Sequence, residues 1–414
     1  MRRCVLSLWI LVWILGSAPQ LQAQTREECQ ECHADPELTT ETESGEEISL
    51  FVPDSVFDAS VHADLECIDC HADIVELPHE DTLKTVDCGS CHEDEAEAVA
   101  KSVHGMELRA RSPDAPTCAD CHGTHDILPM DNPASRISKA NQPKTCGRCH
   151  SDPDIIARNQ IPMVAPVAIY EGSIHGRLTQ EREDAATCSD CHRGHLILTP
   201  LNPASSIFKL EIPNTCGKCH EAIYEEYRIS VHARALQQGA KDAPVCTDCH
   251  GEHDILRPEN PDSPTSGFRV PVEVCSPCHA SERLAKKYGL TPARVTTYEN
   301  SYHGLALRGG KATVANCGSC HGVHAILPSS DPRSPIHRDN LVETCGKCHP
   351  NPTENFARGR IHPVGEEAEA RVIQMVRWIY IVLIAVVIGF MVLHNFIDFI
   401  AKAKRLRLAQ HGHG

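Results

Sequence analysis

The chain has 414 residues, a formal net charge of -17 and 23 cysteines, but only 4% of its residues are aromatic. Low aromatic content with high charge is typical of disordered chains, but the regular spacing of the cysteines excludes disorder, so something other than large side chains is expected to fill the interior. Residues 24–370 carry 31 basic and 55 acidic residues, a net charge of -24, which disfavours nucleic acid as a partner and favours proteins with basic surfaces.

Residues 1–23 are predicted to be a secretory signal peptide. Arg2 and Arg3 precede an apolar run from Cys4 to Leu15, and small or polar residues follow as far as Ala23. This order matches the regions of a signal peptide, whereas the apolar run is short for an uncleaved membrane anchor. Residues 24–372 are therefore expected to form an exported, periplasmic domain of a bacterial protein.

The periplasmic domain contains one short motif, Cys-x-x-Cys-His, eleven times, and the motif uses 22 of the 23 cysteines. The cysteines are Cys29 and Cys32, Cys67 and Cys70, Cys88 and Cys91, Cys118 and Cys121, Cys146 and Cys149, Cys188 and Cys191, Cys216 and Cys219, Cys246 and Cys249, Cys275 and Cys278, Cys317 and Cys320, and Cys345 and Cys348. The motif histidines are His33, His71, His92, His122, His150, His192, His220, His250, His279, His321 and His349. This motif attaches c-type haem through two thioethers, and its histidine binds the iron. The sequence therefore predicts eleven covalent c-type haems.

Three other uses of cysteine pairs fit this pattern less well. A zinc ribbon does not need a histidine directly after every pair. A thioredoxin-like redox site uses a single pair. A disulfide framework would leave the eleven histidines without a role.

The spacing of the motifs repeats along the chain. Cys88 and Cys216 are 128 residues apart, and Cys216 and Cys345 are 129 residues apart. The motifs between them follow the same offset, which indicates duplicated four-haem blocks at about 88–215 and 216–344. Self-similarity of this kind predicts an extended repeat architecture.

A second set of eleven histidines matches the number of motifs. Six follow a Ser-x-His pattern or, at His362, a degenerate copy of it: His62, His104, His175, His232, His303 and His362. Four lie three residues after a motif histidine, and His79 is a displaced fifth member of this class: His79, His125, His195, His253 and His324. We interpret these as distal iron ligands; the alternative is that they are surface histidines without a chemical role. His337, His394, His411 and His413 remain.

The spacing of these histidines excludes the simplest pairing. The segment 93–103 is predicted to be helical, which places His92 and His104 roughly 18 Å apart along one axis. His122 and His125 are within about one turn, too close to bind one iron from both faces. Each distal histidine is therefore expected to serve a haem other than that of the motif it follows. Methionine, the other common distal ligand, occurs in the periplasmic domain only as Met106, Met130 and Met163.

Residues 373–400 are predicted to be a transmembrane helix, because Trp378–Ile397 has 20 residues without a formal charge. Lys402, Lys404, Arg405 and Arg407 follow it, so the positive-inside rule places residues 401–414 in the cytoplasm as a basic tail. His394 lies within this span and is expected to face a membrane-embedded partner subunit, since an intramembrane histidine is costly without one.

On these motifs, residues 29–362 resemble the multihaem c-type cytochromes with doubled Cys-x-x-Cys-His motifs. The resemblance implies a mainly α-helical protein with few strands, short helices, long loops and stacked bis-histidine haems. The segment Gly389–Asp398 looks like the anchor of multihaem cytochromes that pair with an integral b-type cytochrome. The quinol-oxidising tetrahaem cytochromes differ, because they are anchored at the N-terminus.

We expect an electron-transfer subunit rather than an enzyme, anchored in the bacterial cytoplasmic membrane with its haem domain in the periplasm. Its expected partners are an integral b-type cytochrome or another quinone-linked subunit and periplasmic redox proteins with basic surfaces. The alternative is a multihaem reductase of nitrite, hydroxylamine or a sulfur oxyanion, which needs one haem with an open position. The second motif, Cys67–His71, is the weakest point of the ligand count because His79 breaks the spacing rule.

Overall fold

A computed structural model describes residues 24–411, except 43, 44, 46, 80–82, 183, 360 and 364–367. The predicted signal peptide therefore lies outside the described residues. The chain divides into two compact units, one ending at Ile207 and the other beginning at Phe208.

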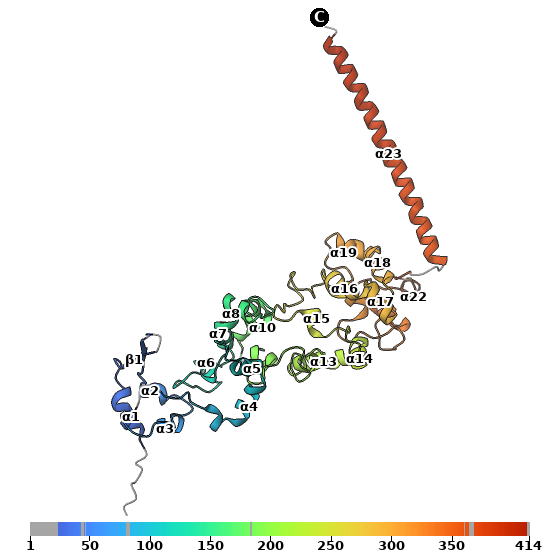
Figure 1. Cartoon of the computed structure of the whole chain (residues 1–414). Helices are drawn as coiled ribbons and strands as arrows, with labels where there is room; N and C mark the ends of the chain where they lie inside the picture. The colour runs from blue at the N-terminus through green and yellow to red at the C-terminus, as the bar shows by residue number, and fades with distance from the viewer. Residues whose placement is uncertain are drawn as a thin grey trace, which may run out of the picture. The chain divides into compact units, whose positions relative to one another are not determined.

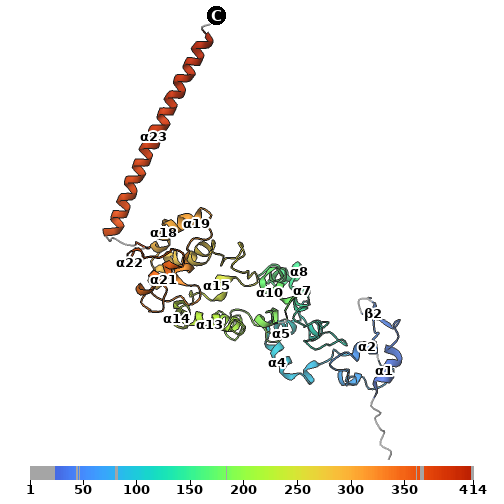
Figure 2. The ribbon, with the colours of Figure 1, turned by 180° about the vertical axis from the view of Figure 1, so that it is seen from behind.

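The first unit consists of short helices and one hairpin. Its elements are α1 (Arg26–His33), β1 (Thr39–Glu41), β2 (Glu47–Ser49), α2 (Asp54–Phe57), α3 (Cys67–Cys70), η1 (Cys88–Ser90), α4 (Glu93–Lys101), α5 (Val103–Arg109), α6 (Cys118–His122), α7 (Gln142–His150), α8 (Pro153–Arg158), α9 (Pro166–Gly172), α10 (Ile174–Thr179) and α11 (Cys188–His192). The two strands are antiparallel, with Thr39 opposite Ser49. The hairpin returns to α1, where Val52 N–H donates to the carbonyl of His33 (2.8 Å; Figure 2).

The second unit repeats this succession of short helices and ends in a long one. Its elements are α12 (Ile212–Gly217), α13 (Glu221–Arg228), α14 (Val231–Gln237), α15 (Cys246–His250), η2 (Val270–Cys275), α16 (Ser276–His279), α17 (Glu282–Tyr288), α18 (Ala293–Glu299), α19 (Tyr302–Arg308), α20 (Cys317–His321), η3 (Arg338–Asn340), α21 (Leu341–Gly346), α22 (Glu354–Ala357) and α23 (Ala368–His411).

The expected fold class is confirmed: the chain is mainly helical with irregular loops and little sheet (Figure 1). α23 is a single helix of 44 residues. Within it, Arg371–Arg405 is long and apolar enough to cross a membrane, with a mean hydropathy of 2.6 in its most apolar window. By length and composition alone, this helix therefore fits the predicted membrane span.

The prediction of one helix over residues 93–103 is wrong, because the chain breaks at Ser102. Ser102 is extended (φ -77°, ψ 169°) and ends α4, and its hydroxyl accepts the N–H of Gly105 (3.1 Å) as the N-cap of α5. The same hydroxyl donates to the carbonyl of Val99 (2.7 Å). A serine that bonds the backbone on both sides competes with helical hydrogen bonds and turns the chain.

The glycine that directly follows the Ser-x-His histidine in some copies shows how tight this corner is. A Cβ on Gly105 would lie 2.0 Å from the carbonyl oxygen of Val99, and one on Gly176 would lie 2.1 Å from that of Tyr170. Backbone can approach backbone this closely only where a side chain is absent. The Ser-x-His-Gly segment therefore forms a compact corner. This corner fixes the backbone position from which the histidine side chain extends.

The interior contains small polar side chains instead of a large apolar core. The largest fully buried side chains among the described residues are Thr187, Ser102, Ser173, Ser230, Ser263 and Ser334. One apolar cluster, formed by Leu236, Ala243 and Val245, lies in the second unit. Protein interiors are normally close-packed with apolar side chains, whereas few large apolar side chains are fully buried among the described residues.

Candidate haem-binding sites

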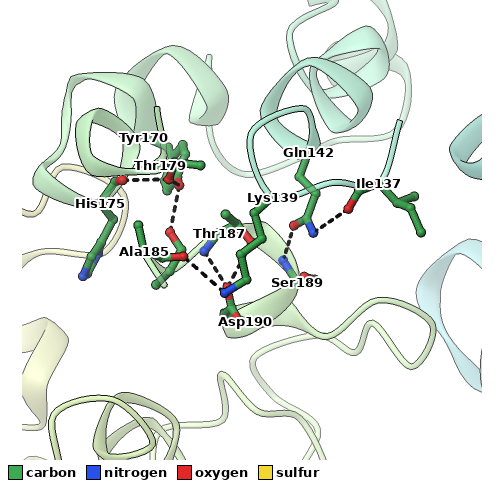
Figure 3. A network of polar contacts seen from close by, with 11 residues as sticks. Ile137, Lys139, Gln142, Tyr170, His175, Thr179, Ala185, Thr187, Ser189 and Asp190 are labelled. Carbon is green, nitrogen blue, oxygen red and sulfur yellow. Dashed lines mark hydrogen bonds and ion pairs between the residues drawn. The ribbon is translucent and has the colours of Figure 1, made fainter. Parts of the chain in front are cut away.

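Five of the motifs form short α-helices whose first residue is a motif cysteine: α3, α6, α11, α15 and α20. In α11 the second of the two residues between the cysteines, Asp190, caps the helix. Its carboxylate accepts hydrogen bonds from the N–H (2.8 Å) and the hydroxyl (3.0 Å) of Thr187. Lys139 adds an ion pair to Asp190 (3.1 Å; Figure 3). Burial alone would raise the pKa of Asp190, but the bonds from Thr187 and Lys139 bring it below its usual value. The variable positions of the motif thus hold the cysteines in register.

The local support of α11 continues into neighbouring helices. Gln142 of α7 accepts the N–H of Ser189 (3.1 Å) and donates to the carbonyl of Ile137 (3.2 Å). The hydroxyls of Tyr170 and Thr179 are 2.7 Å apart on the other side of the motif (Figure 3). Gln142, from the helix of the Cys146 motif, therefore helps to fix the position of the Cys188 motif.

Nine of the eleven motif histidines each face one candidate distal histidine. In the first unit the ring centroids of His33–His79, His71–His125, His92–His62, His122–His195 and His150–His104 are 6.0, 6.2, 6.0, 5.9 and 6.3 Å apart. In the second unit those of His250–His324, His279–His232, His321–His362 and His349–His303 are 6.1, 6.1, 6.3 and 6.1 Å apart. In each pair the distal histidine follows a motif other than that of its partner. His175, His192, His220 and His253 are not among these nine pairs, and their assignment stays a prediction.

These distances can be compared with the space that one iron needs between two imidazoles. Histidine–metal bonds are about 2.0 Å long, and a five-membered ring with bonds of about 1.35 Å has its centre about 1.15 Å from each atom. Two imidazoles on opposite faces of one iron therefore have centroids about 6.3 Å apart. The nine observed distances, 5.9 to 6.3 Å, fit a haem iron between the rings.

Ordinary ring packing accounts for these pairs less well. Packed aromatic rings range over about 4.5–7 Å, as His349 and Phe356 at 4.9 Å and Tyr302 and His303 at 6.3 Å illustrate. The nine histidine pairs occupy a much narrower range of distance, although their interplanar angles vary from 8° to 68°. A constant distance without a constant angle indicates a spacer of fixed thickness rather than stacking.

For two of the candidate ligand histidines, hydrogen bonds define which ring nitrogen carries the proton. His33 Nδ1 lies 2.8 Å from the carbonyl oxygen of Leu50; because a carbonyl only accepts, Nδ1 carries the proton. His362 Nδ1 lies 3.1 Å from the Thr297 hydroxyl, which donates its own proton to the carbonyl of Arg294 (2.8 Å). Thr297 must therefore accept from His362. In both residues Nε2 is left with its lone pair, which is the form that binds a metal.

Burial also keeps these imidazoles neutral. It lowers the pKa of His104, His122, His150 and His250, and it lowers that of His232 to about 4. Desolvation disfavours the charged form of a histidine, and only a neutral imidazole can donate its lone pair to iron.

Successive motifs lie next to each other within each unit. Thiols of neighbouring motifs share side-chain hydrogen bonds at Cys29–Cys67, Cys88–Cys118, Cys146–Cys188, Cys216–Cys246 and Cys275–Cys317. At Cys70, Cys121, Cys249 and Cys320, burial raises the thiol pKa and a cysteine of the next motif (Cys91, Cys146, Cys278 and Cys345) raises it further. These sulfurs would be thioethers in a haem-loaded chain and would then no longer donate hydrogen bonds. The contacts therefore show only that neighbouring motifs are close together. Within each unit the motifs follow one another in space as they do in sequence.

The comparisons with known proteins agree with this geometry. Residues 59–151 match the family model of cytochrome c3. This segment contains four of the motifs and the distal candidates His62, His79, His104 and His125. No curated protein and no solved structure matches the chain. The cytochrome c3 match and the cysteine pairs support a multihaem c-type cytochrome, and the family implies c-type haems.

Sequence reasoning missed three tyrosines that support Cys-x-x-Cys-His motifs. Tyr170, Tyr227 and Tyr298 stand three residues before a Ser-x-His serine and donate to the carbonyls of Ala186 (2.8 Å), Pro244 (2.8 Å) and Ala315 (3.1 Å). Each carbonyl lies two residues before a motif. The repeated sequence pattern Tyr-x-x-Ser-x-His could have indicated these tyrosines.

Sequence reasoning also missed a backbone contact between the two classes of distal histidine. The residue after the serine donates its N–H to an isoleucine two residues beyond a distal histidine: Val61 to Ile127 (2.9 Å), Val103 to Ile197 (2.9 Å) and Val231 to Ile326 (2.8 Å). Each bond fixes one Ser-x-His histidine beside one histidine of the other class. The distal ligands of two different proposed haems are thus held by the same backbone bond.

Tyr298 makes stability depend on alkaline pH. Burial raises the pKa of Tyr298 to about 12, above the value of about 10 in an unfolded chain. The stability that Tyr298 contributes is therefore complete below pH 10 and is lost as the pH rises through 12. We expect Tyr298→Phe to lower the free energy of unfolding by about 1 kcal/mol at pH 8 and to flatten its fall between pH 10 and 12. Denaturant titrations across this range measure both effects. Tyr302→Phe is the control, because Tyr302 is 75% exposed; an equal change there would contradict the assignment.

Proposed function

We propose that this chain is an electron-transfer protein that binds eleven c-type haems, each with two histidine ligands, and conducts electrons between a quinone-linked membrane partner and periplasmic redox proteins. The observation that carries the proposal is the set of nine motif–distal histidine pairs at 5.9–6.3 Å. Haem iron supplies reversible one-electron exchange when it is bound by two histidines.

The residues of each site have separate tasks. The two cysteines would hold the porphyrin through thioethers, and the motif histidine that follows them would be one iron ligand. The distal histidine, from a different segment, would be the second ligand. With both faces closed, substrate has no position to bind, which favours electron transfer over the reductase alternative. The second motif, Cys67–His71, supports this choice. The ring centroids of His71 and His125 are 6.2 Å apart, and those of His79 and His33 are 6.0 Å apart, so both motif histidines have a candidate distal partner.

The order of the motifs supports conduction. Contacts between the thiols of neighbouring motifs support a close spacing of consecutive porphyrins within each unit. Electron transfer between cofactors becomes much slower as their edges separate. A chain that holds successive cofactors edge to edge therefore favours stepwise transfer in sequence order.

The C-terminal segment supports a membrane partner. His362, paired with His321 at 6.3 Å, precedes the start of α23 at Ala368 by six residues. Six residues extend at most about 20 Å, so the proposed haem at the Cys317 motif lies near the membrane helix. We propose that it is the haem closest to the membrane partner, an integral b-type cytochrome or another quinone-linked subunit. His394, whose ring lies 6.3 Å from that of Phe390, is the proposed contact with that subunit.

The charge of the chain supports the remaining parts of the proposal. Residues 24–370 have a net charge of -24, which would attract basic periplasmic proteins over a long range. The basic residues after α23 favour a cytoplasmic C-terminus. Together with the predicted signal peptide, they support anchoring in the bacterial cytoplasmic membrane with the haem domain in the periplasm.

The haem count is the direct test of this proposal. We expect pyridine haemochrome absorbance and the intact mass of the mature protein to agree on eleven haems per chain. We also expect electron paramagnetic resonance to show only low-spin ferric haem, because the proposal gives every iron two histidine ligands. Nine or fewer haems, or bound zinc, would contradict the proposed cofactor content. A high-spin haem in the native protein would favour the reductase alternative.

A further inference from the structure

The helix before a Ser-x-His histidine has one position whose side chain, in two of the copies, lies beside a second candidate histidine ligand. This position, four residues before the serine, is Val56, Ala98, Ile169, Glu226 or Thr297 in successive copies; we call it the S-4 position. In the two copies where it is polar, its side chain lies at Nδ1 of a distal histidine: Glu226 at His324 and Thr297 at His362.

Thr297 shows that the S-4 position reaches the imidazole directly. Its hydroxyl accepts the Nδ1 proton of His362 at 3.1 Å while donating to Arg294. A group that receives the far proton of a ligating imidazole fixes the ring and makes it a stronger electron donor to the metal. Thr297 does this without a charge.

Glu226 places a negative charge at the same point. Its Oε2 lies 3.6 Å from His324 Nδ1, beyond a good hydrogen bond but within ion-pair range. A carboxylate at this distance stabilises the additional positive charge of an oxidised site. The Glu226 side chain is 54% exposed, so water screens part of the interaction and the effect is that of a surface ion pair rather than a buried one.

The equivalent position in the first unit is apolar. Val103 of the first unit and Val231 of the second make the same backbone bond, to Ile197 and Ile326 respectively. This bond fixes each histidine two residues before the isoleucine, His195 or His324, against the preceding helix. Ala98 therefore occupies, relative to His195, the place that Glu226 occupies relative to His324.

We propose that the S-4 residue sets the reduction potential of individual haems, and that Glu226 makes the haem of the Cys246 motif more reducing than its counterpart at the Cys118 motif. The proposal rests on the proposed ligation of iron by His250 and His324. Oxidation of this site removes one electron, which passes to a neighbouring haem, and Glu226 stabilises the resulting charge without itself being oxidised. The duplicated blocks thereby acquire different potentials although their ligands are the same.

Potentiometric titration of the full-length, haem-loaded protein tests the proposal, with haem methyl resonances in nuclear magnetic resonance spectra identifying the haem that changes. We expect Glu226→Gln to lower the oxidised-to-reduced ratio of one haem about threefold at a fixed applied potential, the size of an exposed ion pair. Ala98→Glu should raise that ratio for a different haem, that of the Cys118 motif. Glu225→Gln is the matched control, because Glu225 is 50% exposed and pairs with Arg228 at 2.5 Å.

Each outcome bears on one claim. Unchanged potentials in Glu226→Gln and Ala98→Glu would overturn the proposal, as would an equal shift in Glu225→Gln. Replacement of His324 by alanine tests the ligation separately: it should produce one high-spin haem. If it does not, the proposed function is wrong at this site, whereas a high-spin haem together with an unaltered Glu226→Gln potential rejects only the tuning role.

Discussion

Replacing His232 by alanine is expected to convert one of the eleven proposed haems from low spin to high spin. The His232 ring lies 6.1 Å from that of His279, and burial lowers its pKa to about 4, so it is a neutral imidazole held at ligand distance. Without it, one iron loses its distal ligand and gains an open position. Absorption and electron paramagnetic resonance spectra should show one high-spin centre, and electron transfer through the second unit should slow by at least tenfold, which corresponds to about 1.4 kcal/mol of activation free energy.

The control for this experiment is His337, which is among the histidines that we did not assign to a haem. Its side chain is 22% exposed, and its Nδ1 accepts the N–H of Asp339 (3.3 Å) as the cap of η3. His337→Ala should leave all haems low spin. An unchanged spectrum in His232→Ala would show that His232 is not a ligand.

Deletion of Ala368–Gly414 is expected to move the protein from the membrane to the soluble fraction without loss of haem. The deletion removes α23, whose most apolar window has a mean hydropathy of 2.6, but keeps all eleven motifs and His362. A helix of this length and composition supplies enough apolar surface to hold a protein in a bilayer. Fractionation followed by haem staining, with the haem-to-protein ratio, measures both parts of the prediction.

A chimera controls for general effects of the truncation. Fusing residues 1–367 to an unrelated single-span helix should restore membrane attachment, but it should not restore electron transfer from quinol if His394 contacts the partner subunit. Retention of the truncated protein in salt-washed membranes would contradict a single anchor. Loss of haem on truncation would show that α23 also supports the haem domain.

The duplicated blocks suggest how a long multihaem chain can vary its potentials while keeping its geometry. The buried serine, the histidine and the backbone bond to isoleucine recur at Ser102 and Ser230. The S-4 side chain differs between them, alanine in one and glutamate in the other. Geometry depends on backbone contacts that a side-chain change leaves intact, whereas potential depends on charge near the ligand.

The sequence by itself determined the features that depend on short-range chemistry. Attachment of a haem needs two cysteines and a histidine within five residues, so each motif is complete in local sequence. The match of residues 59–151 to cytochrome c3 supports the cofactor class that the motifs predicted. The apolar run that became α23 was equally visible, because bilayer thickness fixes the length of a spanning helix. The mainly helical, loop-rich fold class was confirmed.

The tertiary structure alone decided which histidines face each other. His122 and His195, or His33 and His79, are brought within about 6 Å by packing between distant segments, and no local rule specifies such partners. The break of the predicted helix at Ser102 had a different origin. The hydroxyl of Ser102 bonds Val99 and Gly105, each only three residues away, so this corner was a local feature that sequence reasoning did not recognise. Residues such as Glu226 and Tyr298 acquire their roles only from what the folded chain places against them.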